Sequence, residues 1–471
     1  MTATAIVWFR RDLRLADNPA LDAARRKHDC VVPVYIDDPE AEGDWARGGA
    51  SRWWLHHSLL ELDRRLRDRG SRLIVARGDS LEVLRRVSRA SGARAVFWNR
   101  VYEPRLVERD RSIKRSLRDD GLEVESSQAG LLFEPWQLLK DDGSPYRVFT
   151  PFWKQMQQRW TPPAASPEPR RLAAPKRWPA SLEIDELHYL PRLDWADGFS
   201  DCWAPGEAGG RRQLQSFVNE TVGTYDSRRD FPGTAGTSRL SAHLHFGEVS
   251  PAQVARSLDE AGELPAGKGR WSFLREIAWR EFSAHLLFHY PHLSDAPLNP
   301  SFNEFPWRRP RDYADDLRAW QTGRTGIPLV DAGMRELWAT GWMHNRVRMV
   351  VASFLTKNLL IPWQEGARWF WDTLVDADLA NNTQGWQWTA GCGADAAPYF
   401  RVFNPVLQGE KFDPDGDYVR RWCPELAARK GRRIHQPLDE HQSKRVGYPA
   451  PRVDLKVSRQ RALDAWQRLR S

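Results

Sequence analysis

Residues 5–36 read AIVWFRRDLRLADNPALDAARRKHDCVVPVYI, which passes from one short apolar run through a helical segment to a second apolar run. Further apolar runs follow at 72–76, 94–98 and, more weakly, 122–125, and amphipathic segments such as Ser51–Arg69 separate them. Strands that alternate with helices are typical of a doubly wound parallel sheet, so we predict a five-stranded α/β domain. Ligands of such sheets bind beyond the carboxyl ends of the strands. The pattern GxGxxG does not follow the first strand, which argues against ordinary dinucleotide binding.

The second half of the chain has a different pattern. Thr161–Ala180 holds six prolines and no apolar periodicity, so it is predicted to be an extended linker. From about Ala208 onward strand patterns are absent and helical ones dominate, for example at Arg270–Phe288. We therefore predict three parts: an α/β domain at 1–130, an interdomain linker at 131–207 and a large all-helical domain at 208–471.

The composition limits the classes of function. The chain of 471 residues holds 24 Trp, more than its 19 Phe or 10 Tyr, and a net charge of +8 that fits either an anionic partner or an ordinary basic surface. Its four cysteines lie far apart without a CxxC pair, so we predict neither a disulfide framework nor a metal site. No apolar stretch approaches the ~18–20 residues of a membrane span. With no secretory signal at the N-terminus either, we expect a cytoplasmic protein with no membrane partner.

Two polar runs are candidate sites near the middle of the chain. Hydroxyls and an arginine at Thr237–Ser241, before a helical pattern, suit a phosphate or pyrophosphate, although an ordinary helix cap is the alternative. Glu276, Trp279 and Arg280 follow at i, i+3 and i+4, so one helix face presents a carboxylate, an indole and a guanidinium. A salt-bridged core helix is the alternative there. A nearby stretch, GELPAGK at 262–268, lacks the Ser or Thr of a phosphate-binding loop and is not assigned a nucleotide.

Two more polar runs lie further along the chain. In Gly341–Met349, the side chains of Asn345, Arg348 and Met349 share a helix face. Asp376–Trp388 crowds carboxylates, amides and indoles into thirteen residues, a mixture that is unfavourable in a core unless it binds something. Core packing is the alternative for most of the tryptophans around these runs.

Together these blocks resemble the photolyase/cryptochrome family, and within it the class I photolyases that repair cyclobutane pyrimidine dimers. The resemblance spans nearly the whole chain, in the family's order. Its blocks are WFRRDLRLADNPAL near the N-terminus, GTSRLS (236–241), WREF (279–282), TGWMHNRVRM (340–349), DADLANN (376–382), GWQW (385–388), and FNP followed by QGEKFD (403–413).

The resemblance implies that the helical domain binds FAD in a folded form. It places around the phosphates Tyr225, Thr237, Ser238, Arg239, Leu240 and Ser241. Along the flavin and ribose it places Arg280, Asn345, Asp376 and Asp378, with Arg348 paired to Asp376 and Asn382 at flavin N5. This chain reads LANNTQGWQW where the family usually reads LAANNGGWQW, so Asn381 is an alternative to Asn382.

The resemblance also implies light-driven repair of ultraviolet-damaged DNA. A flipped-out dimer would receive one electron from excited, reduced FAD, the cyclobutane ring would open, and the electron would return. The lesion pocket would be formed by Glu276, Trp279, Asn345, Met349 and Trp386, with Glu276 accepting a hydrogen bond, or donating one if protonated. Arg346 and Arg401 are expected to contact DNA phosphates. Electrons from the surface would reach the flavin through Trp307, Trp363 and Trp386.

Several points stay open at this level. A second, light-harvesting chromophore of the folate or deazaflavin type is a further expectation, with its identity unknown. A cryptochrome that senses light without repair is the main alternative, and Asn382 and the short C-terminal tail argue against it. A photolyase for six-four photoproducts is expected to show HxxxH where this chain reads His344–Arg348. A relative of this fold that binds DNA without repair is the third alternative. We expect a monomer.

Overall fold

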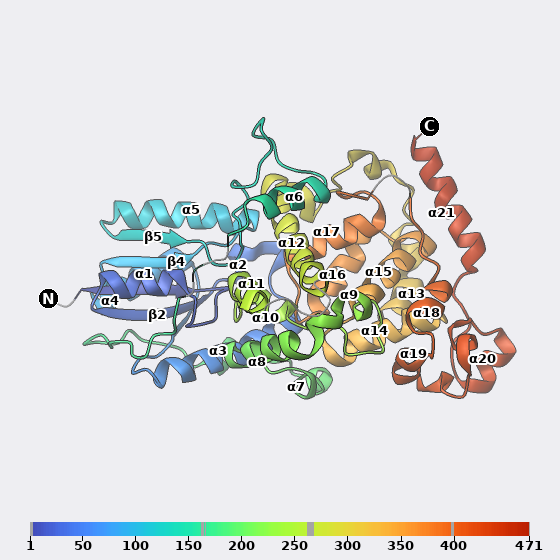
Figure 1. Cartoon of the computed structure of the whole chain (residues 1–471), viewed down its shortest axis with the longest axis horizontal. Helices are drawn as coiled ribbons and strands as arrows, with labels where there is room; N and C mark the ends of the chain where they lie inside the picture. The colour runs from blue at the N-terminus through green and yellow to red at the C-terminus, as the bar shows by residue number, and fades with distance from the viewer. Residues whose placement is uncertain (1–2, 162–163, 165, 261–267, 397–399, 471) are drawn as a thin grey trace.

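The computed structural model describes residues 3–161, 164, 166–260, 268–396 and 400–470. An α/β half and a helical half lie side by side along the long axis (Figure 1). One five-stranded parallel sheet has the order β3-β2-β1-β4-β5, which confirms the predicted fold class. Each strand lies within two residues of its predicted run: β1 Thr4–Phe9, β2 Cys30–Asp37, β3 Ile74–Arg77, β4 Ala95–Asn99 and β5 Glu123–Ser127.

The central strands are mostly apolar because helices cover both faces of the sheet. Every residue of β1 and of β2 is buried. Ala5, Val7 and Phe9 face the core that holds helices α1 (Pro19–Lys27) and α3 (Gly49–Arg67). Ile6 and Trp8 face the opposite core with α4 (Ser80–Ser91) and α5 (Pro104–Asp119). The alternation of side chains along one strand thus builds two cores.

The segment between the two halves contains little regular structure apart from α6 (Phe149–Gln158) and the short α7 (Phe199–Cys202). The described part of its proline-rich stretch is extended and bound to the α/β half. Leu172 is buried beside α3, and its N–H donates to the Arg69 carbonyl at 2.9 Å. Further on, the N–H of Leu182 donates to the Val75 carbonyl at 2.9 Å.

The second half is helical, and beyond Glu207 the described residues contain no strand. Among the described helices, none combines the length and the apolar character needed to cross a membrane. Residues 262–267 of the GELPAGK stretch lie outside the described residues. The helices are α8 (Glu207–Ser216), α9 (Tyr225–Arg228), α10 (Ser241–His245), α11 (Pro251–Glu260), α12 (Lys268–His289), α13 (Pro310–Gln321), α14 (Pro328–Thr340), α15 (Asn345–Ser353), α16 (Trp363–Thr373), α17 (Leu379–Ala390), α18 (Pro405–Phe412), α19 (Asp417–Trp422), α20 (Glu440–Val446) and α21 (Leu455–Arg470).

Helix α12 fastens the helical half to the segment that follows the sheet. Arg280 Nη1 donates to the Gly130 carbonyl at 2.8 Å. The Glu281 carboxylate accepts from the N–H groups of Leu132 and Phe133 at 2.9 and 3.1 Å. Burial raises the pKa of Glu281 to about 7. These contacts fix α12, and with it the predicted site residues, against the α/β half.

Candidate functional site

Helix α12 brings Glu276, Trp279 and Arg280 to one half-buried face, as the sequence spacing predicts. Their side chains nevertheless contact separate partners. The Trp279 ring stacks on Phe149 of α6, with centroids 3.7 Å apart and planes at 6°. Glu276 accepts a hydrogen bond from Arg229 at 2.5 Å. The face therefore offers one flat indole and one carboxylate already paired with a cation.

The hydroxyl-rich run 237–241 ends at the start of α10, where a helix start was predicted. Arg239 has a left-handed backbone, with φ of 51°. Its guanidinium lies between two indoles, with its central carbon 4.3 Å from the Trp203 ring and 4.7 Å from the Trp342 ring. The buried Nε of Arg239 has no hydrogen-bond partner among the described residues. The loop thus carries a rigidly held cation with an unused donor.

Tyr225 begins α9 and lies beneath this loop in an aromatic cluster. Its ring meets Phe217 and Phe273 edge-on, at centroid distances of 5.6 and 5.2 Å. Burial, with the nearby Glu276 carboxylate, raises the pKa of Tyr225 well above its ordinary value. The hydroxyl therefore keeps its proton and remains a hydrogen-bond donor at neutral pH.

The predicted pairing of Arg348 with Asp376 is present. Arg348 Nη2 donates to both oxygens of the Asp376 carboxylate at 2.8 and 3.1 Å, and its Nε donates to the Met343 carbonyl at 2.7 Å. The Asp376 side chain is 3% exposed, so this pair is largely desolvated. It ties α15 to the chain that enters α17. On the same helix α15, Asn345 is exposed at the first turn and Met349 is half-buried one turn later.

Arg346 is not a free cation in this structure. Its Nη2 lies 2.8 Å from the Asp230 carboxylate, and its guanidinium covers the Phe412 ring at 4.4 Å. The predicted phosphate contact would therefore require Arg346 to share or exchange this partner.

The start of α17 distinguishes the two neighbouring asparagines. Asp378 caps the helix by accepting from the backbone N–H of Asn381 at 3.0 Å, and the Asn381 amide also donates to it at 2.9 Å. Asn382 instead donates its side-chain N–H to the Ala367 carbonyl of α16 at 3.0 Å. Asn381 is thus engaged in its own helix cap, whereas Asn382 bridges two helices, and its side-chain oxygen has no hydrogen-bond partner among the described residues.

Asp378 also borders a narrow pocket between the halves, with Arg11 and Arg280 among its lining residues. Burial alone would raise the pKa of Asp378. The hydrogen bond and charge of His245, 3.3 Å away, together with Arg280 and Arg11, bring that pKa well below its ordinary value. Asp378 is therefore a carboxylate at neutral pH, in a pocket that both halves build.

Trp386 lies too deep for one of its predicted roles. Its side chain is 2% exposed and packs edge-on against Phe370 and Trp320, at centroid distances of 5.0 and 6.1 Å. A Cβ atom added at Gly366 of α16 would come within 3.0 Å of three carbons of the Trp386 ring, so this glycine makes room for the indole. The prediction that Trp386 contacts DNA as a pocket wall is wrong, because surrounding side chains separate it from the surface.

A second indole, Trp388, lies nearer the surface, two residues further along the same GWQW run. Trp388 is half-buried, and the Arg401 guanidinium lies 5.8 Å from its ring. Arg401 is itself exposed, and its carbonyl accepts from the buried Lys357 ammonium at 3.1 Å. The run contained both indoles, and only their burial shows which one reaches the surface.

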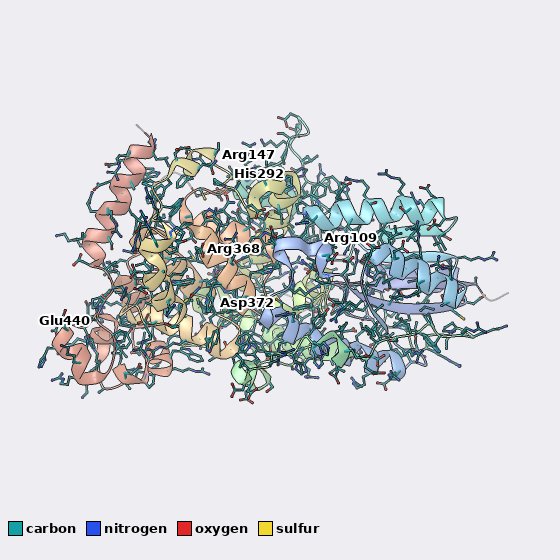
Figure 2. The ribbon with its side chains drawn as sticks, turned by 180° about the vertical axis from the view of Figure 1, so that it is seen from behind. Arg109, Arg147, His292, Arg368, Asp372 and Glu440 are labelled. Atoms are coloured by element: carbon teal, nitrogen blue, oxygen red, sulfur yellow. The ribbon has the colours of Figure 1, made fainter. Side chains whose placement is uncertain are left out.

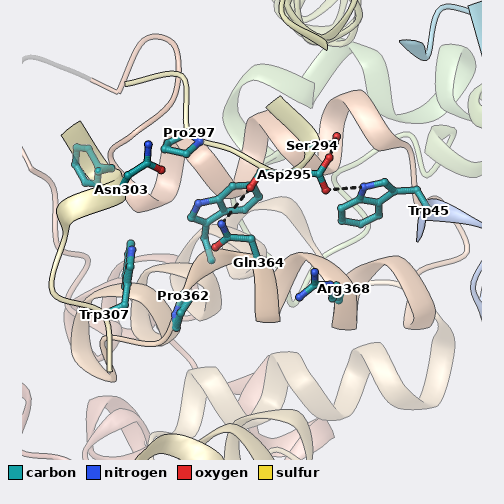
Figure 3. Close-up of a pocket in the computed structure, with 11 residues that line it drawn as sticks. Trp45, Ser294, Asp295, Pro297, Asn303, Trp307, Pro362, Gln364 and Arg368 are labelled. Carbon is teal, nitrogen blue, oxygen red and sulfur yellow. Dashed lines mark hydrogen bonds between the residues drawn. The ribbon is translucent and has the colours of Figure 1, made fainter. Parts of the chain in front are cut away.

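The other two predicted relay tryptophans meet at one pocket. Trp363 is the first residue of α16, 2% exposed, and Gly366 beneath Trp386 follows it by one helical turn. Trp307 is half-buried in the chain before α13. Both line a pocket of about 900 Å³, and Figure 3 shows Trp307 and Trp45 at its opposite ends. The order Trp386, Trp363, Trp307 thus runs from the core to a surface pocket.

Several buried N–H donors near these residues have no partner among the described residues. They are Arg239 Nε, Arg346 Nε, Trp386 Nε1 and His344 Nε2. The Nδ1 of His344 accepts from the Arg346 backbone at 3.1 Å, so its other nitrogen carries the proton. Buried donors without partners are rare in folded proteins. An excess of donors fits a ligand rich in acceptors, as the phosphates and ring carbonyls of FAD are.

Comparison with protein families covers both halves. Residues 5–170 match the family model described as DNA photolyase, and residues 273–468 match the model described as FAD binding domain of DNA photolyase.

Relatives of known identity match along the whole chain. The deoxyribodipyrimidine photo-lyase of Agrobacterium fabrum is 48% identical, over 99% of this chain and 98% of the relative. Cryptochrome-1 of Arabidopsis thaliana is 39% identical, over 98% of this chain and 70% of the relative. The crystal structure of a bacterial class III photolyase from Agrobacterium tumefaciens superposes with a TM-score of 0.95 at 48% identity, covering 100% of this chain and 98% of that one. The chain belongs to the photolyase/cryptochrome family.

Proposed function

We propose that this chain repairs ultraviolet-damaged DNA in light by splitting cyclobutane pyrimidine dimers with an electron from FAD. The observation that carries the proposal is the likeness to a photo-lyase over practically the full length of both proteins, whereas the plant cryptochrome is longer than the part matched here. The protein acts as a monomer in the cytoplasm. Its four unpaired cysteines favour a reducing compartment; they are Cys30, Cys202, Cys392 and Cys423.

FAD, when bound, supplies the photoexcited electron that opens the cyclobutane ring. The chain holds and orients it with residues from four separate segments: Tyr225, Thr237, Ser238, Arg239, Leu240, Ser241, Arg280, Asn345, Arg348, Asp376, Asp378 and Asn382. The partnerless donor of Arg239 supports a phosphate nearby. Asn382 is favoured over Asn381 as the neighbour of flavin N5, because Asn381 is tied to Asp378.

The lesion pocket is formed by Glu276, Trp279, Asn345, Met349 and Trp388. An enzyme that works on a base inside a duplex must extrude it, and a dimer that stacks poorly is extruded at lower free energy. The flat faces of Trp279 and Trp388 suit fused pyrimidines, and Glu276 can exchange its bond with Arg229 for one to a base edge. Arg346 and Arg401 contact phosphates, each adding about 0.9 to the salt slope on duplex DNA.

Trp386, Trp363 and Trp307 carry electrons from the surface to the flavin site. The packing of Trp386 on α16, one turn from Trp363, supports the first step of this relay. The pocket shared by Trp363 and Trp307 supports the second.

Three finer assignments belong to the same proposal. The parts of the chain are 1–130, 131–207 and 208–471. We propose class III in place of the expected class I; the solved structure at 48% identity, which is described as class III, supports this choice. A second chromophore binds against the carboxyl edge of the sheet, at a narrow pocket where arginines outnumber the acids Asp38 and Glu42. An anionic, planar antenna suits the Arg10 and Arg109 guanidiniums that cover Trp8 there.

The decisive experiment is repair of ultraviolet-irradiated oligo-thymidine by the purified, reduced, FAD-loaded protein. Blue light should lower the dimer content and darkness should not. Equal dimer content in both arms would refute repair and leave the light-receptor alternative.

A matched pair of variants tests the pocket. Trp388→Ala should lose most of the light-dependent repair. Trp338→Ala, which removes an indole that is 47% exposed on α14, should retain it. Equal repair by the two variants would remove Trp388 from the lesion pocket.

A further inference from the structure

The pocket that contains Trp307 and Trp363 also contains an arginine without a hydrogen-bond or ion-pair partner among the described residues. Arg368, on α16, lines the pocket and is exposed. Its guanidinium makes no hydrogen bond or ion pair with any described residue. The carboxylate one turn further along α16, Asp372, accepts instead from the backbone N–H of Gly49 at 2.7 Å. Figure 2 shows Arg368 and Asp372 near each other on the same open face.

The acidic group of this pocket is already occupied. Asp295 accepts from the Ser294 hydroxyl at 2.6 Å and from the Trp45 indole N–H at 3.4 Å (Figure 3). Gln364 donates its side-chain N–H to the Asp295 backbone carbonyl at 3.4 Å, and its buried Oε1 has no partner among the described residues. The pocket therefore offers an anion one unused guanidinium, and its wall holds one buried acceptor, Gln364 Oε1, without a partner among the described residues.

Two of the residues that line this pocket are indoles, which can be oxidised. Trp307 and Trp363 are the two outer members of the proposed relay, and both border the same space of about 900 Å³. A ligand in it would lie against the indoles that lose electrons when the relay works. Electron transfer weakens steeply with distance, so a donor held here outcompetes one that meets the protein at random.

We propose that this pocket is a binding site for a small, anionic, hydroxyl-bearing reductant of the enediolate class, which returns an electron to the oxidised relay. This inference rests on the relay in the proposed function. Arg368 pairs with the anion, and Gln364 Oε1, once its side chain turns toward the pocket, accepts from one of the ligand's hydroxyl groups. The bound monoanion loses one electron to the indole radical cation and one proton to water. The indole becomes neutral, and the donor leaves as a radical anion.

The test uses the FAD-loaded protein with ascorbate as the probe. After a blue-light pulse, the decay of the tryptophan radical is followed by transient absorption at increasing ascorbate concentration. The decay rate should saturate in the unmodified protein. In Arg368→Ala the rate at low ascorbate should fall at least about fivefold and rise linearly, because an electrostatic site raises the local concentration of its ligand by tenfold or more. Arg368→Lys should restore part of the effect.

Two controls separate the site from general surface charge. Arg86→Ala removes another exposed arginine, from α4, and should leave the decay unchanged. Dithiothreitol, which is uncharged at neutral pH, should act equally on the unmodified protein and on Arg368→Ala. Linear dependence on ascorbate with one slope in all these proteins would overturn the proposal.

A further measurement needs no light and no flavin chemistry. Saturation-transfer NMR of ascorbate in darkness should detect binding to the unmodified protein and a loss of the signal in Arg368→Ala. Equal signals would also overturn the proposal. Failure of the relay itself has a different signature, since no tryptophan radical would then form after the pulse, whether or not ascorbate binds in the dark.

Discussion

The fit of Trp386 against Gly366 gives a sharp prediction for Gly366→Ala. The added Cβ would come within 3.0 Å of three ring carbons, where ordinary carbon contacts lie at about 3.5–4.0 Å. The ring has little room to retreat, because Phe370 and Trp320 pack against it edge-on. Overpacking of this kind costs about 1–3 kcal/mol, and a rigid indole against a helix backbone belongs at the upper end.

The same substitution also stabilises helix α16 through the higher helix propensity of alanine. Alanine is favoured over glycine inside a helix by about 1 kcal/mol, so the net loss of unfolding free energy should be about 2 kcal/mol. Gly385→Ala on the neighbouring α17 is the matched control, because a Cβ there meets nothing within 4 Å. That variant should be about 0.5–1 kcal/mol more stable than the unmodified protein.

The assay is guanidinium unfolding of both FAD-loaded variants, followed by circular dichroism. The two midpoints should move in opposite directions, with the free energies separated by about 3 kcal/mol, or roughly a hundredfold in the folded-to-unfolded ratio. If Gly366→Ala unfolds at or above the midpoint of the unmodified protein, the claim that α16 is shaped around Trp386 is wrong.

Three other changes test separate parts of the site. Arg348→Met should lower the unfolding free energy by about 2–3 kcal/mol, somewhat less than for a fully buried pair because Arg348 is partly exposed, and adding Asp376→Asn should recover part of the loss in the same denaturation assay. Glu281 has its pKa raised from 4.5 to about 7 by burial, so the folded protein binds more protons than the unfolded chain between those values, and stability should fall as pH rises from about 4.5 to 7. Glu281→Gln should flatten that fall in a pH series of unfolding midpoints, and an unchanged slope would assign it to other groups. Trp363→Phe should slow flavin photoreduction followed by absorbance, whereas an unchanged rate would remove Trp363 from the relay.

The sheet could be predicted from sequence because its signal is local. A short apolar run between polar segments marks a strand buried on both faces, and each of the five runs became a strand. The shared face of helix α12 could also be predicted from local sequence, since its residues at i, i+3 and i+4 do lie on one side of the helix. The contact partners of those side chains could not be predicted in this way, because they lie far away in the sequence. Trp279 stacks on Phe149, which lies 130 positions earlier, and Arg280 binds a carbonyl 150 positions away.

The tryptophans show the same limit more clearly. The run GWQW contains two tryptophans that the sequence does not distinguish, because nothing within the run indicates which one is buried. That depends on Gly366 and Phe370 of another helix, which receive Trp386 and leave Trp388 near the surface. The choice between Asn381 and Asn382 has a similar origin, because one amide completes its own helix cap and the other reaches α16.

The burial gradient along the relay gives it a direction. A radical cation at Trp386 would be poorly solvated, because the indole is 2% exposed among Phe370 and Trp320, and burying an unpaired charge carries a large free-energy penalty. The half-buried Trp307 borders an open pocket at the surface, so a positive charge there gains hydration. The charge is therefore driven outward and is kept away from the flavin site. In the proposed relay, indole serves at these positions because it can be oxidised, and the difference in its surroundings would set the direction in which the electron moves.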